Sequence, residues 1–335
     1  MRSRLLAFLV IALTLALAAC GAPSKEEVMK KLSGKWTDSK GYELKATMEI
    51  KTGAEPRLYN VDVWHTKPDF YRVSVSQDGE GDAQMIVRNQ EGVFVVTPSL
   101  GKTYKFQSDW PAQNSQAYLI GALSEDIKAD KKAVMTENDK SYVFKTATRN
   151  NHKNVLPTQE IHIDKKTLLP THVSVMNENN EEKIRITFKK ITLGTDRKPS
   201  DYAVERDSQD MDSGEKPDVA DEKTGLRVYY PSLNWEGVTL VDEVNVKTNE
   251  GTRAFLTYGG KKDFVIVQEP SLPTPPKMHV SVEGDPVDLG FTVAALTDKS
   301  IRWEYGGVSF FLASETLTKD EMIQVASSMV APEMK

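Results

Sequence analysis

Three side chains that can bind a metal ion or transfer a proton lie close together in the sequence. His162 and Asp164 form an H-x-D pair, and His172 follows on the next predicted strand. Imidazole and carboxylate groups with this spacing can coordinate a metal or act as a general base. They alternate with Ile161 and Ile163, however, so they point to the opposite, solvent-facing side of the sheet. We therefore expect a solvated surface here and no metal site.

The rest of the sequence contains no arrangement typical of an enzyme. His65, His152 and His279 have no partner residues nearby in the sequence. The segment Asp210–Glu215 is similar to a calcium loop, but its glycine, Gly214, comes at the fifth position instead of the sixth. No G-x-S-x-G, phosphate-binding glycine loop or H-E-x-x-H is present. We predict a protein that is not an enzyme, with no catalytic residue and no cofactor.

Cys20 is the only cysteine of the chain, and it ends a hydrophobic N-terminal segment. Arg2 and Arg4 are followed by an uncharged stretch over residues 5–19. As a helix this stretch spans roughly 22 Å, less than the roughly 30 Å of a bilayer core. Residues 1–19 therefore have the layout of a secretory signal peptide that is removed.

The four residues Leu17-Ala18-Ala19-Cys20 resemble the bacterial lipobox. The resemblance implies cleavage before Cys20 and attachment of diacylglycerol to its thiol. We expect an extracytoplasmic protein, lipid-anchored to the cell membrane at Cys20; the alternative is an ordinary cleavage site followed by a chance cysteine. Loss of Arg2 and Arg4 changes the formal net charge from −5 to −7, which argues against a nucleic acid partner.

The elements that position these residues are mostly strands. Ser24-Lys25-Glu26-Glu27 is a capping box that predicts a first helix, with Val28, Leu32 and Trp36 at helical spacing. Residues 111–128 have the spacing of a helix or of two helical pieces. Alternation of apolar and polar residues predicts about eleven antiparallel strands near residues 42–51, 58–66, 69–77, 83–89, 92–98, 101–107, 132–137, 141–149, 158–164, 168–177 and 181–192.

A second, smaller domain follows an acidic segment. Residues 206–223 are rich in Asp, Glu, Ser and Gly and predict a linker between a first domain, residues 20–205, and a second, residues 224–335. A capping box at Thr318 predicts a final helix. The fold class is mainly β (α+β), and further strands are predicted near residues 225–230, 237–247, 252–259, 262–269, 290–297, 300–305 and 307–314.

The order of the elements and the segment Trp64–Val73 resemble the LolA/LppX superfamily of outer-membrane lipoprotein carriers, and among them the Bacillus-type sporulation lipoproteins. Gly237–Leu240 and Phe264–Glu269 resemble the uncharacterised C-terminal domain of that group. The resemblance implies a curved half-barrel whose lid helices cover a hydrophobic cavity for acyl chains. In contrast to the soluble carriers, this chain is predicted to be acylated. Neither Arg72 nor Arg88 is assigned as the arginine that locks the lid in the carriers.

The alternating apolar residues of the predicted strands define the candidate ligand site. We predict that these residues share one concave face and line a cavity; the alternative is that they pack a dry core. The predicted function is binding of a hydrophobic ligand, a lipid acyl chain or a lipoprotein, in sporulation or envelope lipoprotein handling. The alternative is an envelope interaction or signalling scaffold without ligand transfer. The predicted cavity-lining residues are Tyr59, Val61, Val63, Tyr71, Val73, Val75, Ile161, Ile163, Val173, Val175, Ile184, Ile186 and Phe188.

Overall fold

The structure is a computed structural model of the chain. It describes residues 23–51, 56–77, 83–98, 102–106, 110, 116–150, 153, 155–204, 226–233, 235–271, 279–289 and 291–330. Several predicted features lie outside these residues: the signal peptide 1–19, Cys20, the acidic linker 206–223 with Asp210–Glu215, and His152.

The first helix, α2 (Lys25–Thr37), begins where the sequence predicts it. The Ser24 hydroxyl accepts a hydrogen bond from the backbone N–H of Glu27, and the Glu27 carboxylate accepts one from the backbone N–H of Ser24. This capping box satisfies two of the N–H groups that a helix start leaves unpaired. Val28, Leu32 and Trp36 form the buried stripe of the helix. No helix among the described residues is long and apolar enough to cross a membrane.

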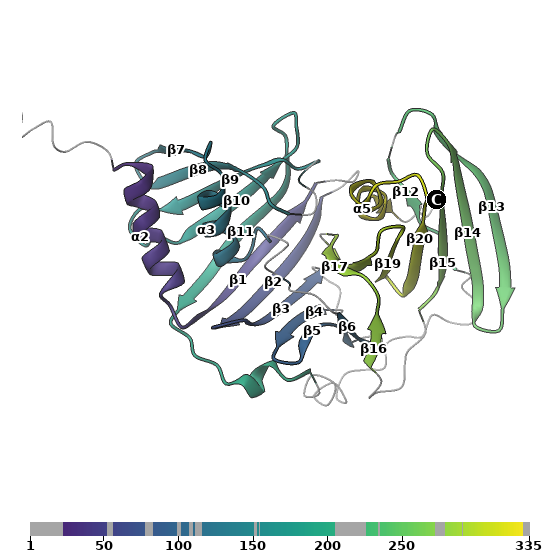
Figure 1. Cartoon of the computed structure of the whole chain (residues 1–335), viewed down its shortest axis with the longest axis horizontal. Helices are drawn as coiled ribbons and strands as arrows, with labels where there is room; N and C mark the ends of the chain where they lie inside the picture. Colours follow the sequence, from purple (N-terminus) through teal and green to yellow (C-terminus); the bar gives the residue numbers. More distant parts are fainter. Residues whose placement is uncertain are drawn as a thin grey trace, which may run out of the picture.

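The N-terminal sheet has twelve strands, and eleven of them form a continuous antiparallel array (Figure 1). This confirms the predicted mainly β fold class. The spatial order is β16-β6-β5-β4-β3-β2-β1-β11-β10-β9-β8-β7. The eleven strands are β1 (Gly41–Ile50), β2 (Arg57–Thr66), β3 (Phe70–Gln77), β4 (Ala83–Asn89), β5 (Gly92–Thr97), β6 (Lys102–Phe106), β7 (Val134–Glu137), β8 (Ser141–Ala147), β9 (Thr158–Asp164), β10 (Pro170–Met176) and β11 (Glu182–Leu193).

One face of this sheet is covered by α2 and by α3 (Ile120–Ala129), and we call it the helix-covered face (Figure 1). Leu44, Ala46 and Met48 of β1 lie opposite Val63, Val61 and Tyr59 of β2, so that these apolar side chains form one layer. The predicted helix or pair of helical pieces over residues 111–128 is wrong for residues 116–119, and residues 111–115 lie outside the described part of the chain. The described residues 116–119 form a turn closed by a 2.9 Å bond from the Leu119 N–H to the Gln116 carbonyl.

The opposite, outer face of the sheet carries a small core of its own. The 3-10 helix η2 (Pro199–Tyr202) brings the chain after β11 back across β3 and β4. The buried Tyr202 hydroxyl and the Thr66 hydroxyl share a 2.8 Å hydrogen bond. The small core contains Phe70, Met85, Val87, Phe94, Val96, Tyr202 and Val204, with Trp64 packed against it.

The C-terminal part of the chain forms a separate sheet of seven antiparallel strands, in the order β13-β14-β15-β20-β19-β18-β17. Helix α5 (Lys319–Ser327) has the predicted capping box of Thr318 and Glu321 and packs against β19. A two-stranded pair joins β12 (Tyr230–Pro231) to β21 (Met329–Val330). The seven strands are β13 (Val238–Thr248), β14 (Gly251–Gly260), β15 (Phe264–Pro270), β17 (Asp285–Asp288), β18 (Val293–Leu296), β19 (Ser300–Tyr305) and β20 (Val308–Ala313).

The two sheets are joined through one strand that the sequence did not predict. β16 (His279–Val282) leaves the C-terminal part and pairs in parallel with β6 at the edge of the N-terminal sheet. Side chains support this junction: Lys102 Nζ lies 2.5 Å from Glu304 Oε1, and Gln84 Oε1 accepts a 2.8 Å bond from the N–H of Val293. The edge of one sheet is thus completed by a strand from the other part of the chain.

Candidate functional site

The structure brings all thirteen predicted cavity-lining residues together on the helix-covered face. Strand register explains this, because Ala46, Met48 and Ile50 of β1 lie opposite Phe188, Ile186 and Ile184 of β11. Tyr71, Val75, Ile184 and Phe188 are partly buried. Nine of the thirteen are fully buried: Tyr59, Val61, Val63, Val73, Ile161, Ile163, Val173, Val175 and Ile186.

Helix α3 lies over this apolar layer and is held at its C-terminal half by a buried carboxylate. Asp126 is 1% exposed. Its Oδ1 accepts a 2.6 Å bond from Arg149 Nε, and its Oδ2 accepts a 2.7 Å bond from Gln159 Nε2. A buried charge is stable only when it is paired and hydrogen-bonded, so these two partners fix the helix to β9 and to the segment that follows β8.

The other end of α3 is held differently. Leu119 at the N-cap has no side chain that accepts from the first helical N–H groups. The preceding Tyr118 is buried and donates a 3.3 Å hydrogen bond to Asp288 Oδ2 of the C-terminal sheet. Burial, reinforced by the charge of Asp288, raises the pKa of the Tyr118 hydroxyl far above its ordinary value. The N-terminal end of α3 is therefore attached to the second sheet, whereas its C-terminal half is attached to the first.

Aromatic rings close one end of the helix-covered face. His65 stacks on Tyr71 with ring centroids 4.2 Å apart, and Trp110 meets Tyr71 edge-on at 5.8 Å. Arg88, which lies opposite Tyr71 in the sheet, donates a hydrogen bond to the Trp110 carbonyl. Burial lowers the pKa of His65, and its Nδ1 lies 3.0 Å from the Phe70 carbonyl. Arg88 thus connects the sheet to the chain segment that precedes α3.

The candidate metal residues lie on the outer face, as their alternation with Ile161 and Ile163 indicates. His162 and His172 stack with ring centroids 3.9 Å apart, while Asp164 accepts hydrogen bonds from Thr167. Burial and the neighbouring His162 lower the pKa of His172 to about 4. The described part of the chain holds no group of three His, Cys, Asp or Glu residues that could bind a metal.

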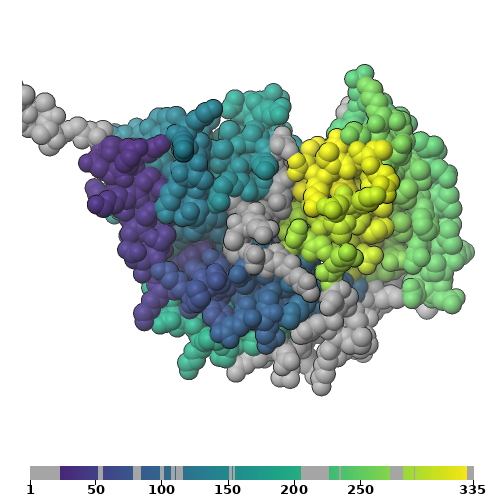
Figure 2. All heavy atoms as spheres, viewed as in Figure 1, coloured from purple at the N-terminus to yellow at the C-terminus, as the bar shows by residue number. Residues whose placement is uncertain are grey.

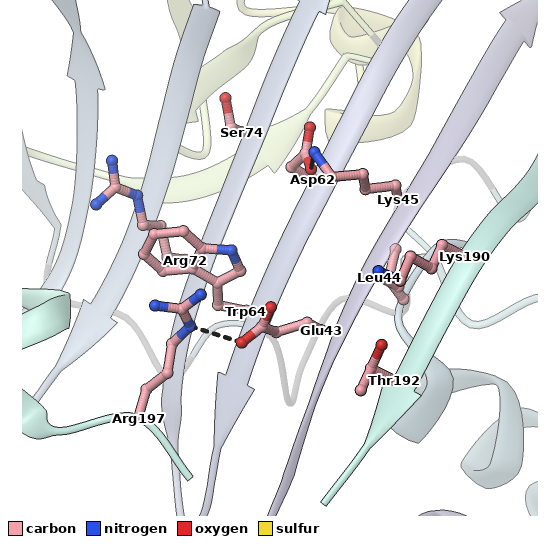
Figure 3. Close-up of a pocket in the computed structure, with 10 residues that line it drawn as sticks. All are labelled: Glu43, Leu44, Lys45, Asp62, Trp64, Arg72, Ser74, Lys190, Thr192 and Arg197. Atoms are coloured by element: carbon pink, nitrogen blue, oxygen red, sulfur yellow. Dashed lines mark hydrogen bonds and ion pairs between the residues drawn. The ribbon is translucent and has the colours of Figure 1, made fainter. Parts of the chain in front are cut away.

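A pocket of about 440 Å³ lies on the outer face, where the sequence predicted only solvent-facing residues (Figure 3). The Trp64 ring is part of its lining, and the guanidinium carbon of Arg197 lies 3.7 Å and that of Arg72 4.7 Å from the ring centroid. Arg197 Nε also donates a 2.9 Å bond to Glu43 Oε1. The lining residues are Glu43, Leu44, Lys45, Asp62, Trp64, Arg72, Ser74, Lys190, Thr192 and Arg197.

Sequence reasoning missed this pocket because its parts come from four strands and a returning segment. Trp64, Arg72 and Asp62 lie on one predicted hairpin, and their alternation with Val61, Val63 and Val73 placed them on the outer face. Nothing in the sequence indicated that Arg197 would fold back over Trp64. Lys45 and Asp62, which are 2.7 Å apart, balance each other, so that the pocket combines paired charges with one aromatic surface.

The chain was compared with solved structures. The Pseudomonas aeruginosa MucA/MucB complex matches with 17% identity and a TM-score of 0.33, covering 92% of this chain and 99% of the other. A LolA superfamily protein from Nitrosomonas europaea matches with 8% identity and a TM-score of 0.32, covering 54% of this chain and 98% of the other.

Sequence comparison gives a stronger result. Residues 2–195 match the family model described as "Sporulation protein YdcC-like". The chain is 39% identical over 320 residues to "Sporulation protein YdcC" of Bacillus subtilis strain 168, covering 94% of this chain and 93% of that protein. These matches confirm the resemblance to Bacillus-type sporulation proteins. The chain belongs to the YdcC-like family of sporulation proteins.

Proposed function

We propose that this protein is a membrane-anchored extracytoplasmic lipoprotein that binds an apolar chain, a lipid acyl chain or the acyl group of a lipoprotein, on its helix-covered face. The observation that carries the proposal is the apolar layer of the helix-covered face together with α3, a helix attached to a different sheet at each end. Binding by burial of apolar surface requires no covalent chemistry.

The proposed anchor fixes where such a ligand would be met. The N-cap of α2 is Ser24, four residues after Cys20. A fully extended chain covers at most about 3.6 Å per residue, so this spacer reaches about 14 Å. An acylated Cys20 would therefore hold α2 close to the bilayer surface. Local transfer or sensing of a ligand fits this tether better than transport across the envelope.

Ligand entry would depend on α3. The Asp126 carboxylate anchors its C-terminal half, while its N-terminal half has no side-chain cap and contacts the second sheet through Tyr118. A rotation of α3 about the Asp126 end would expose the part of the apolar layer that lies beneath this helix. Each methylene that an acyl chain buries there contributes about 0.8 kcal/mol. A chain of ordinary fatty-acid length thus gains enough to offset displacement of a short helix.

Lipid analysis of the purified protein tests this proposal. The protein without residues 1–19 and with Cys20→Ser is extracted with organic solvent, and the extract is analysed by mass spectrometry. We expect stoichiometric lipid in the extract. Val75→Asp places a charge on the helix-covered face and should remove the lipid. Ser74→Asp, on the outer face of the same strand, should not. An empty extract, together with no uptake of a fluorescent fatty acid, would disprove ligand binding.

A second function is supported by a different observation. Nine of the thirteen predicted lining residues are fully buried, as in a dry core. This favours an envelope interaction scaffold in which the N-terminal sheet is structural and other surfaces bind proteins. An empty extract from a stably folded protein would make the scaffold the leading interpretation.

A further inference from the structure

The C-terminal sheet ends in a long strand whose free edge no described strand covers. β13 is the first strand in the order of that sheet, and only β14 pairs with it (Figure 1). From Thr239 to Thr248 every residue of β13 is exposed. An edge with unpaired N–H and C=O groups is a template for a further strand, and natural proteins protect such edges unless they are used.

The side chains of β13 are unusually apolar for an exposed edge. Leu240, Val241, Val244 and Val246 are between 40% and 66% exposed, and they are four of the six exposed large hydrophobic residues in the described chain. Val244 lies beside Phe255 of β14, which lies beside Val267 of β15. The apolar row therefore runs from β13 across β14 to β15, and these strands, coloured green, lie at one side of the molecule (Figure 2).

The regular part of β13 has two defined ends. A bulge between Leu240 and Asp242 interrupts the ladder at one end, and a turn at residues 249–250 ends the strand at the other. The regular stretch is Asp242–Thr248, and its midpoint is Asn245. A second copy of this strand can pair antiparallel with the whole stretch in one register only. In that register, Asn245 of one copy lies opposite Asn245 of the other.

This register is also the one in which the side chains match. In this register, Val244 of one copy would lie opposite Val246 of the other, and Glu243 opposite Lys247. Each pair would occur twice, because the two copies are related by symmetry. Directly opposed residues of an antiparallel pair project to the same side of the sheet, where opposite charges and β-branched pairs are stabilising. The longest possible ladder and the best charge match thus fall on the same register.

We propose that β13 pairs with β13 of a second copy of this chain about a two-fold axis through Asn245, so that the two seven-stranded sheets form one continuous sheet. The contact is isologous and closed, which gives a dimer and not a filament. The proposal is independent of ligand binding on the helix-covered face.

Cross-linking tests the register. The full chain with Asn245→Cys is expressed in a host that processes lipoproteins, and isolated membranes are treated with a short bismaleimide. We expect a covalent dimer. Thr239→Cys, also exposed on β13, is the control, since its two copies would lie about 40 Å apart in this register. The unsubstituted chain shows whether Cys20 reacts. No dimer with Asn245→Cys, or equal dimer with Thr239→Cys, overturns the proposal.

Charge exchange tests the pairing itself. Glu243→Lys and Lys247→Glu each place two like-charge pairs in the contact, and each should weaken dimerisation about tenfold in analytical ultracentrifugation. The combined variant Glu243→Lys/Lys247→Glu restores both pairs and should restore the dimer. Circular dichroism checks that each variant is folded. Single variants that dimerise as tightly as the original chain, or a combined variant that stays monomeric, contradict this arrangement.

Discussion

Gln159 donates a 2.7 Å hydrogen bond from Nε2 to Oδ2 of Asp126, and both side chains are almost completely buried. Gln159 belongs to β9 and Asp126 to α3, so that this bond connects the covering helix to the sheet beneath it. Arg149 occupies the other carboxylate oxygen at 2.6 Å. One acidic side chain thus holds the C-terminal half of α3 to the N-terminal sheet.

Replacing that acid should loosen the helix. Asp126→Ala leaves Gln159 without its acceptor in a buried place and removes the charge partner of Arg149, which should cost about 2–4 kcal/mol of unfolding free energy. Urea denaturation measures this loss, and hydrogen exchange over residues 120–127 should accelerate. Glu125→Ala, an exposed position of the same helix, is the control and should change stability by less than about 0.5 kcal/mol.

The junction between the two sheets contains a buried ion pair that can be tested with a double-mutant cycle. The side chains of Lys102 and Glu304 are 12% and 8% exposed, and the Ser271 hydroxyl donates a 2.8 Å bond to the same Glu304 oxygen. Lys102→Met leaves a buried carboxylate without its cation and should cost about 3–5 kcal/mol in thermal or chemical unfolding.

The combined variant Lys102→Met/Glu304→Gln removes both charges and should lose less stability than Lys102→Met alone. If the two single changes and the combined change are simply additive, the pair is not coupled and the interpretation of this junction is wrong.

Glu182 should make the free energy of unfolding depend on pH in the acidic range. Burial opposes its ionisation, but hydrogen bonds from Arg185, Lys51 and Ser174 outweigh burial and lower its pKa to about 2. A carboxylate with a depressed pKa stabilises the fold above its unfolded value of about 4.3 and loses that contribution as the pH falls toward 2.

Denaturant titrations at pH 7, 4 and 2.5 measure this contribution, which we expect to be on the order of 1–2 kcal/mol because solvent screens the partly exposed partners Lys51 and Arg185. Glu182→Gln should be less stable than the original chain at pH 7 and should lose less on acidification. Glu178→Gln, in the exposed turn nearby, should follow the original chain. Identical pH profiles for Glu182→Gln and the original chain would refute the assignment.

The stacking of Arg197 on Trp64 should distinguish arginine from lysine. Lysine can still form an ion pair with Glu43, but it has no planar group to lie over the Trp64 ring. Arg197→Lys should therefore lower the free energy of unfolding by roughly 0.5–1.5 kcal/mol. Hydrogen exchange across residues 195–204 should increase at the same time. Lys189→Ala, exposed on β11, should leave that segment unchanged. Full protection in Arg197→Lys would show that charge alone is sufficient.

Much of the N-terminal sheet could be predicted from the sequence because each strand is marked by a pattern of apolar and polar residues within that strand. The alternation around Ile184, Ile186 and Phe188, for example, places β11 and its two faces, and the capping boxes at Ser24 and Thr318 mark two helix starts. Alternation along each strand, carried across the sheet by strand register, places the thirteen apolar residues on one face; that they line a cavity stays a prediction.

What the sequence did not indicate depends on contacts between distant segments. β16 has only four residues and follows a proline-rich stretch, so it has no alternation long enough to recognise, and its partner β6 is far away in sequence. The start of α3 is set by a turn at Gln116, which overrides the helical spacing. The outer-face pocket needs Arg197 to return over Trp64, a contact made through the chain that follows β11.

The parallel pairing of β16 with β6 makes the two halves of the molecule hard to separate. A protease that cuts the peptide chain between Val204 and Leu226 would break its covalent continuity, yet β16 would still be held in the N-terminal sheet by its hydrogen bonds to β6. The two fragments should therefore migrate together in native chromatography and come apart only in denaturant. Fragments produced separately would have to fold in each other's presence, since the sheet edge of one is supplied by the other.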